Sequence, residues 1–146
     1  MKAGYGQQRA VAILSAYVEK HGGGRIFTNV GFKMANDTCL EPDVAFVRDA
    51  HIVRTKLDDW FDGAPALAVE VISPANRAAK LDQKVRVYLD NGAEAVWVID
   101  PIRKQLTAHH AGGHFEIFEL PNGQVAETSI FPGLHIDLAA LFEDLG

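Results

Sequence analysis

Two short apolar runs, separated by one amphipathic segment, constrain the fold of this 146-residue chain more than any other feature. Residues 67–72 and 95–99 are aliphatic or β-branched almost throughout, which is typical of strands buried on both faces. Between them, Leu81, Val85 and Leu89 form a helical stripe within residues 77–91. A strand, a helix and a strand at this spacing predict a parallel pair joined by a crossover.

The remaining segments predict further helices and strands around this unit. A helix-periodic stretch ends at a glycine run, two β-forming stretches lie on either side of a turn, and a Gly-Gly pair indicates a hairpin. Residues 48–66 are less regular, and within them residues 58–65 predict a loop or a short helical turn. We therefore expect one α/β domain over residues 1–146, with a β-rich C-terminal part. The predicted ranges are a helix at 7–20, one or two strands at 25–34 bent near Asn29 or Gly31, a strand at 43–47, a hairpin at 105–110 and 114–120, and a final helix at 138–145.

Composition excludes several classes of protein. The net charge of −5 argues against a sequence-independent DNA coat, which is normally basic, but it is compatible with an enzyme that has a locally basic cleft. Cys39 is the only cysteine, so an internal disulfide or a multi-cysteine zinc site cannot form. No run is long and apolar enough for a membrane span, and we expect a cytoplasmic protein.

A carboxylate inside the first apolar run is the strongest functional signal. An ionised Glu70 between Val69 and Val71 costs several kcal/mol unless a partner compensates for its burial, as in a metal site or an acid–base site. Asp43 opens the strand at 43–47, and two acids on neighbouring strands suit a hard cation such as Mg²⁺.

Structural roles remain open for the same residues. Asp43 follows a proline and is compatible with a turn cap. Glu70 is compatible with a buried ion pair, for which Arg25, Lys33 and Lys84 are the candidate partners. Asp100, which precedes Pro101, is expected to be a turn residue at the end of a strand.

Several short motifs occur in a recognisable order from about Tyr5 to the end of the chain. They are Glu-Pro-Asp-Val at 41–44, Val-Glu-Val-Ile-Ser-Pro at 69–74, Lys84 and Tyr88 four residues apart, Val-Trp-Val-Ile-Asp-Pro at 96–101, and Pro-Gly-Leu at 132–134. In this order they resemble the Uma-two-type family of putative restriction endonucleases, a bacterial family within the PD-(D/E)xK nuclease superfamily. The resemblance implies a restriction-endonuclease-like core, in which helices flank a mixed β-sheet.

The resemblance also implies roles for individual residues. Asp43, Glu70 and the backbone carbonyl of Ile72 would hold Mg²⁺ or Mn²⁺, and DNA would be the substrate. In the superfamily pattern a lysine lies two residues after the second acid, where this chain has Ile72. In this family a lysine from the following helix takes that place, and Lys84 matches it.

Three further residues are expected to support this site. Lys80 is the alternative lysine, one helical turn before Lys84. Tyr88, one turn beyond Lys84, is expected to buttress it, and the hydroxyl of Ser73 is expected to lie near the site.

One departure from the family pattern leads to a second functional hypothesis. Members of the family usually carry a further N-terminal segment, and the resemblance predicts that this segment is missing here. Its absence would leave a sheet edge exposed and favour a homodimer. Besides a DNA endonuclease, we therefore consider a non-catalytic, dimeric binding or scaffold protein of the same fold, and an RNA-cleaving nuclease that uses the same residues.

Overall fold

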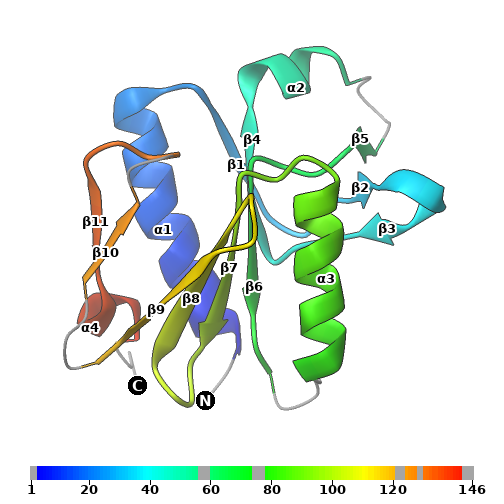
Figure 1. Ribbon diagram of the computed structural model, residues 1–146. Coiled ribbons are helices and arrows are strands. Elements are labelled where there is room, and N and C mark those ends of the chain that lie inside the picture. The colour runs from blue at the N-terminus through cyan, green and yellow to red at the C-terminus, as the bar shows by residue number, and fades with distance from the viewer. Residues whose placement is uncertain (1–2, 56–59, 74–77, 121–123, 128–129, 143–146) are drawn as a thin grey trace.

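A six-stranded mixed sheet forms the centre of the computed structural model, which describes residues 3–55, 60–73, 78–120, 124–127 and 130–142 (Figure 1). β6 and β7 are parallel and are joined through helix α3 (Ala78–Asp90), while every other neighbouring pair in this sheet is antiparallel. This confirms the predicted strand–helix–strand unit. In spatial order the strands are β1 (Gly24–Phe27), β4 (Val44–Arg48), β6 (Leu67–Val71), β7 (Ala95–Asp100), β8 (Gln105–His110) and β9 (Phe115–Glu119).

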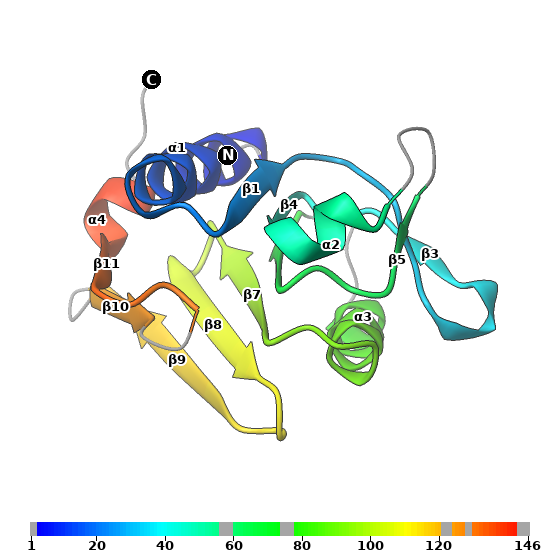
Figure 2. The same cartoon turned by 90° about the horizontal axis from the view of Figure 1, so that it is seen from above.

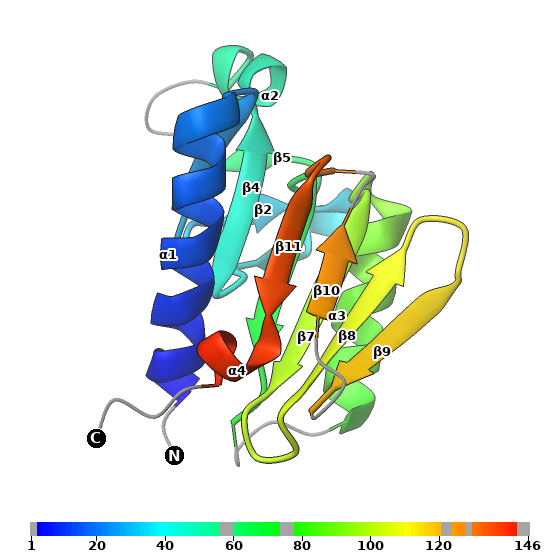
Figure 3. The same ribbon diagram turned by 90° about the vertical axis from the view of Figure 1, so that its left-hand side faces the viewer.

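Different elements cover the two faces of this sheet (Figures 2 and 3). On one face lie α1 (Ala3–His21), α4 (Leu138–Leu141) and the antiparallel pair β10 (Gln124–Glu127) and β11 (Leu134–Asp137). α3 packs on the other face. Three smaller elements accompany α3, namely β2 (Phe32–Lys33), β3 (Cys39–Leu40) and β5 (Phe61–Asp62), which form a three-stranded sheet. The helices α2 (Asp49–Val53) and η1 (Ala35–Asp37) complete the described elements.

Strand alternation divides the apolar side chains into two clusters. In β6, Leu67, Val69 and Val71 belong to the cluster beneath α1, whereas Ala68 belongs to the cluster beneath α3. Successive side chains of a strand point to opposite faces, so Glu70 lies on the α3 side. Burial of each large apolar side chain contributes about 1.5–3 kcal/mol to the free energy of folding, so the apolar side chains of β6 determine which face of the strand lies beneath α1.

The structure extends or corrects several predicted boundaries. The first helix begins earlier than expected, at Ala3, and the bend before β2 is confirmed by Asn29, whose φ is 52°. The prediction of irregular structure at 48–66 was incomplete, because α2 and β5 lie there. β5 is two residues long and is held by parallel pairing with β2, where the rings of Phe32 and Phe61 stack 5.0 Å apart.

The C-terminal helix is shorter than expected. It spans Leu138–Leu141 and is followed by Phe142, and residues 143–145 of the predicted helix lie outside the described part of the chain. Asp137 caps this helix by accepting a hydrogen bond from the backbone N–H of Ala139 at 3.0 Å. In the ranges that the structure describes, no helix has the length and apolarity that a membrane crossing requires.

Candidate active site

The pairing of β4 with β6 brings Asp43 and Glu70 together. The strands are antiparallel with Val44 opposite Val69, so the residues one step beyond, Asp43 and Glu70, face each other where the ladder ends. Because Val44 and Val69 both belong to the cluster beneath α1, the two acids lie on the opposite face, under α3. The fold therefore places the two acids next to each other, close enough for the charge of Asp43 to act on Glu70.

Glu70 is almost completely buried, and α3 supplies polar partners for both of its carboxylate oxygens. Only 3% of the residue is exposed. The hydroxyl of Tyr88 donates a hydrogen bond to Oε2 at 2.8 Å, and Nζ of Lys84 lies 3.9 Å from Oε1. The sequence predicted a compensated carboxylate here, and the structure identifies Tyr88 and Lys84 as the compensating groups.

Burial dominates the electrostatics of this carboxylate. It raises the pKa of Glu70 to about 7, because a desolvated carboxylate favours its neutral form. The hydrogen bond from Tyr88 and the charge of Lys84 lower the pKa of Glu70, and the nearby charge of Asp43 raises it further. The mutual repulsion of the two acids is relieved when a cation or a proton binds between them.

Asp43 is held at two points. Its Oδ2 accepts a hydrogen bond from the backbone N–H of Val71 at 2.7 Å, and its backbone carbonyl accepts one from Nε2 of Gln7 at 2.9 Å. The first bond ties the start of β4 to the end of β6, and the second ties it to α1. The bond from Val71 differs from a turn cap, because its donor lies across the sheet and not within the turn. Sequence patterns did not indicate a role for Gln7, because its contact with Asp43 spans 36 residues.

The two candidate lysines differ in their surroundings. The Lys84 side chain is 38% exposed and reaches Glu70. Lys80 is exposed and lines an open depression of about 400 Å³ on α3 together with Asp82, Gln83 and Arg86. The structure therefore brings Lys84, the preferred candidate, to Glu70.

The supporting residues lie as follows. Tyr88, which we expected to buttress Lys84, donates its hydroxyl hydrogen bond to Glu70. Ile72 follows β6, donates its backbone N–H to the carbonyl of Ile99 at 2.8 Å and packs its side chain against the cluster beneath α3. Ser73 is partly buried one residue farther on. The use of the Ile72 carbonyl as a ligand, and a role for Ser73, stay predictions.

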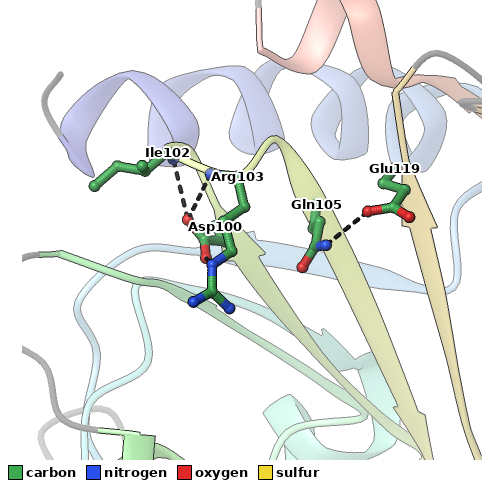
Figure 4. Close-up of polar contacts among 5 residues, drawn as sticks. All are labelled: Asp100, Ile102, Arg103, Gln105 and Glu119. Atoms are coloured by element: carbon green, nitrogen blue, oxygen red, sulfur yellow. Dashed lines mark hydrogen bonds and ion pairs between the residues drawn. The ribbon is translucent and has the colours of Figure 1, made fainter.

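Asp100, another acid at this end of the sheet, closes a turn. Its Oδ1 accepts hydrogen bonds from the backbone N–H groups of Ile102 and Arg103 at 3.0 and 3.1 Å (Figure 4). Figure 4 also shows the neighbouring cross-strand hydrogen bond from Gln105 to Glu119, at 2.7 Å. The structure confirms the expected turn role.

Across the described ranges, no group of three or more His, Cys, Asp or Glu side chains could hold a metal ion.

The donor chemistry of Asp43 and Glu70 fits a hard divalent cation. Both acids supply oxygen, they lie on one face of the sheet, and each repels the other's charge. Mg²⁺ is commonly held by one or two carboxylates, with water and substrate oxygens as its remaining ligands, so a third acidic side chain is not required.

Comparison with known families decides the relationship of this chain. The model of the Uma2 family, described as "Putative restriction endonuclease", matches residues 3–139. The chain belongs to the Uma2 family. The resemblance inferred from the sequence motifs is therefore confirmed, and membership supports a nuclease-like function. A comparison with curated protein sequences gave no match.

A solved structure shows that the Uma2 chain has the expected fold. The crystal structure of a putative nuclease belonging to DUF820 from Anabaena variabilis ATCC 29413 superposes with a TM-score of 0.85. The match covers 97% of this chain and 81% of that protein, at 22% sequence identity. At this identity the likeness establishes the architecture alone, and it confirms the expected mixed α/β core.

Proposed function

We propose that this Uma2 protein is a Mg²⁺- or Mn²⁺-dependent endonuclease that hydrolyses DNA phosphodiester bonds, with Asp43 and Glu70 holding the cation. One observation carries the proposal: two acids lie side by side on the α3 face of the sheet, and the Lys84 ammonium lies beside one of them, Glu70. A bound divalent cation would acidify a water ligand and offset charge on the phosphate.

The residues of the chain provide the remaining requirements. The hydrogen bond from Val71 holds the Asp43 carboxylate, and the hydrogen bond from Gln7 holds the Asp43 backbone carbonyl. Asp43 is therefore held in place before any cation binds. Lys84 is partly exposed, which lets its ammonium contact both Glu70 and an incoming phosphate. There it would stabilise the charge that develops during hydrolysis, since a lysine can act from a helix as well as from a strand.

Incubation of supercoiled plasmid with the protein and Mg²⁺ or Mn²⁺ tests this function. We expect nicked and linear products with the wild type and none with Glu70→Gln, which retains the size of the side chain but loses the charge. Equal cleavage by both proteins would eliminate this site. Parallel reactions with single-stranded DNA, duplex DNA and RNA identify the substrate, and preferential cleavage of RNA would replace the DNA assignment.

A non-catalytic binding protein is the second candidate, and one observation favours it. Tyr88 and Lys84 together compensate Glu70 within the chain, as in a purely structural buried ion pair. A ligand that binds the native state raises thermal stability, so this candidate predicts no shift of the melting temperature by Mn²⁺. A clear Mn²⁺ shift that disappears in Asp43→Asn would count against it.

Dimerisation through a sheet edge remains part of both candidates. β1 and β9 are the outer strands of the six-stranded sheet, and Phe115 and Ile117 of β9 are exposed. Unpaired edge strands favour association. Sedimentation velocity across a range of protein concentrations would detect a homodimer, and a constant monomer would exclude it.

A further inference from the structure

Lys84 and Tyr88, one helical turn apart on α3, approach different oxygens of the Glu70 carboxylate. The Tyr88 contact with Oε2 is a hydrogen bond of 2.8 Å. The Lys84 contact with Oε1, at 3.9 Å, is too long for a hydrogen bond and acts through charge alone. The two oxygens therefore have unequal roles, because one is held by a directional bond and the other faces a cationic group.

Tyr88 is well suited to hold an oxygen in place. Its ring has no exposed surface and packs in the cluster beneath α3 with Leu81, Val85 and Val96. A phenol hydroxyl is protonated at neutral pH, so it acts as a donor to the carboxylate. A phenol has few rotatable bonds, and a close-packed ring cannot turn its hydroxyl away without moving its neighbours.

We propose that Tyr88 is a positioning residue that commits Oε2 of Glu70 to a hydrogen bond, presents Oε1 to the cation, and thereby selects Mn²⁺ and Mg²⁺ over Ca²⁺. Ca²⁺ takes six to eight oxygen ligands and readily uses both oxygens of one carboxylate, whereas Mg²⁺ uses an octahedral set. A carboxylate with one oxygen occupied thus disfavours Ca²⁺. This inference rests on the proposed function, because it assumes that Glu70 is a cation ligand.

The variant Tyr88→Phe removes one hydroxyl and keeps the packed ring. Glu70 then becomes free to offer both oxygens, so Ca²⁺ affinity should rise relative to Mn²⁺ affinity. Residues that orient metal ligands typically change affinity by about 10–100-fold, and we expect the ratio of the Ca²⁺ and Mn²⁺ dissociation constants to fall by about tenfold. A loss of packing alone would weaken both ions together and leave this ratio unchanged.

Tyr17→Phe is the matched control. The Tyr17 hydroxyl donates a hydrogen bond of 2.6 Å to the carbonyl of Pro132, and its ring packs against the cluster beneath α1. The control therefore loses one hydrogen-bonding hydroxyl from the opposite face of the sheet. We expect the ratio of the Ca²⁺ and Mn²⁺ dissociation constants of this control to equal that of the wild type.

Mn²⁺ binding followed by electron paramagnetic resonance, with displacement by Ca²⁺, measures the ratio without any nuclease assay. A ratio that falls in Tyr88→Phe and not in Tyr17→Phe supports the inference. An unchanged ratio in Tyr88→Phe overturns the inference alone, provided that Glu70→Gln abolishes Mn²⁺ binding. Mn²⁺ binding that survives in Glu70→Gln, or that is absent from the wild type, overturns the proposed site and this inference with it.

Discussion

The Asp43 side chain accepts a hydrogen bond from the backbone N–H of Val71 at 2.7 Å, so a candidate metal ligand also closes the end of the β4–β6 ladder. The bond occupies Oδ2, and it orients the carboxylate toward the end of β6, where Glu70 lies. The Asp43 side chain therefore has a structural role, through this hydrogen bond, and a proposed role in cation binding. Different substitutions of Asp43 can distinguish the two roles.

We expect Asp43→Ala to lower the free energy of unfolding by roughly 1–3 kcal/mol, because the N–H of Val71 loses this acceptor. Asp43→Asn keeps an acceptor oxygen and removes a charge that raises the pKa of Glu70, so it should be at least as stable as the wild type at pH 8. Urea denaturation in a chelating buffer measures both. Equal stabilities of the two variants would show that the hydrogen bond does not contribute.

Glu70 should give the protein a distinctive dependence of stability on pH. Its native pKa of about 7 lies above the ordinary value of 4.5, so the native state binds the proton more tightly than the unfolded state. This contribution is complete below pH 4.5 and is lost as the pH rises through 7. At 1.36 kcal/mol per pKa unit, the loss is about 3 kcal/mol.

Glu70→Gln isolates this effect, because it cannot ionise and retains the other titrating groups. We expect the wild type to lose stability relative to this variant between pH 5 and pH 8 when metal is removed. Urea denaturation at several pH values gives the difference. A difference that stays constant over this range would contradict the raised pKa.

Lys84 should matter for catalysis more than for folding. Its side chain is partly exposed and its contact with Glu70 is 3.9 Å long, so Lys84→Met should leave the fold intact. Removal of one donor that stabilises developing charge typically lowers kcat by about 10²–10³-fold. Plasmid-cleavage kinetics measure the loss, and Lys80→Met on the same helix is the control. A comparable loss in both variants would show that the effect is general to α3.

The ion pair at the far end of the sheet should act on stability alone. Arg48 donates hydrogen bonds to both carboxylate oxygens of Glu94, at 2.6 and 2.8 Å, and both side chains are 42% exposed. Such exposed pairs contribute at most about 1 kcal/mol. We therefore expect Glu94→Gln to lower stability by that amount or less and to leave Mn²⁺ affinity unchanged, as measured by denaturation and metal titration. An altered Mn²⁺ affinity would reveal coupling along the strands.

The parts of the fold that follow from short-range patterns were predictable. The runs at 67–72 and 95–99 and the stripe between them fixed β6, α3 and β7, because apolar periodicity reports burial directly. Glu70 was identifiable for the same reason, since an acid in a run that packs on both faces needs a partner. The confirmed hairpin β8–β9 followed from its Gly-Gly turn.

The elements that depend on distant partners were not predictable. β5 has two residues, and it forms a strand because β2 pairs with it. Among the described strands, β10 and β11 pair only with each other, as a separate sheet that packs on the six-stranded sheet. At the site, the sequence spacing places Tyr88 one helical turn from Lys84. The hydrogen bond from the Tyr88 hydroxyl to Glu70 depends on how α3 packs on the sheet, which no local pattern shows. Gln7 reaches Asp43 from α1, and no local pattern marks such a contact.

The alternation of β6 makes this protein intolerant of slippage between its strands. Val69 and Val71 flank Glu70 and belong to the cluster beneath α1. A shift of β6 by one residue would turn the carboxylate into that cluster and bring two valines under Tyr88 and Lys84. A misaligned chain could neither bury its apolar side chains nor present its acids, so any molecule that folds stably has, by the same pairing, already assembled its carboxylates.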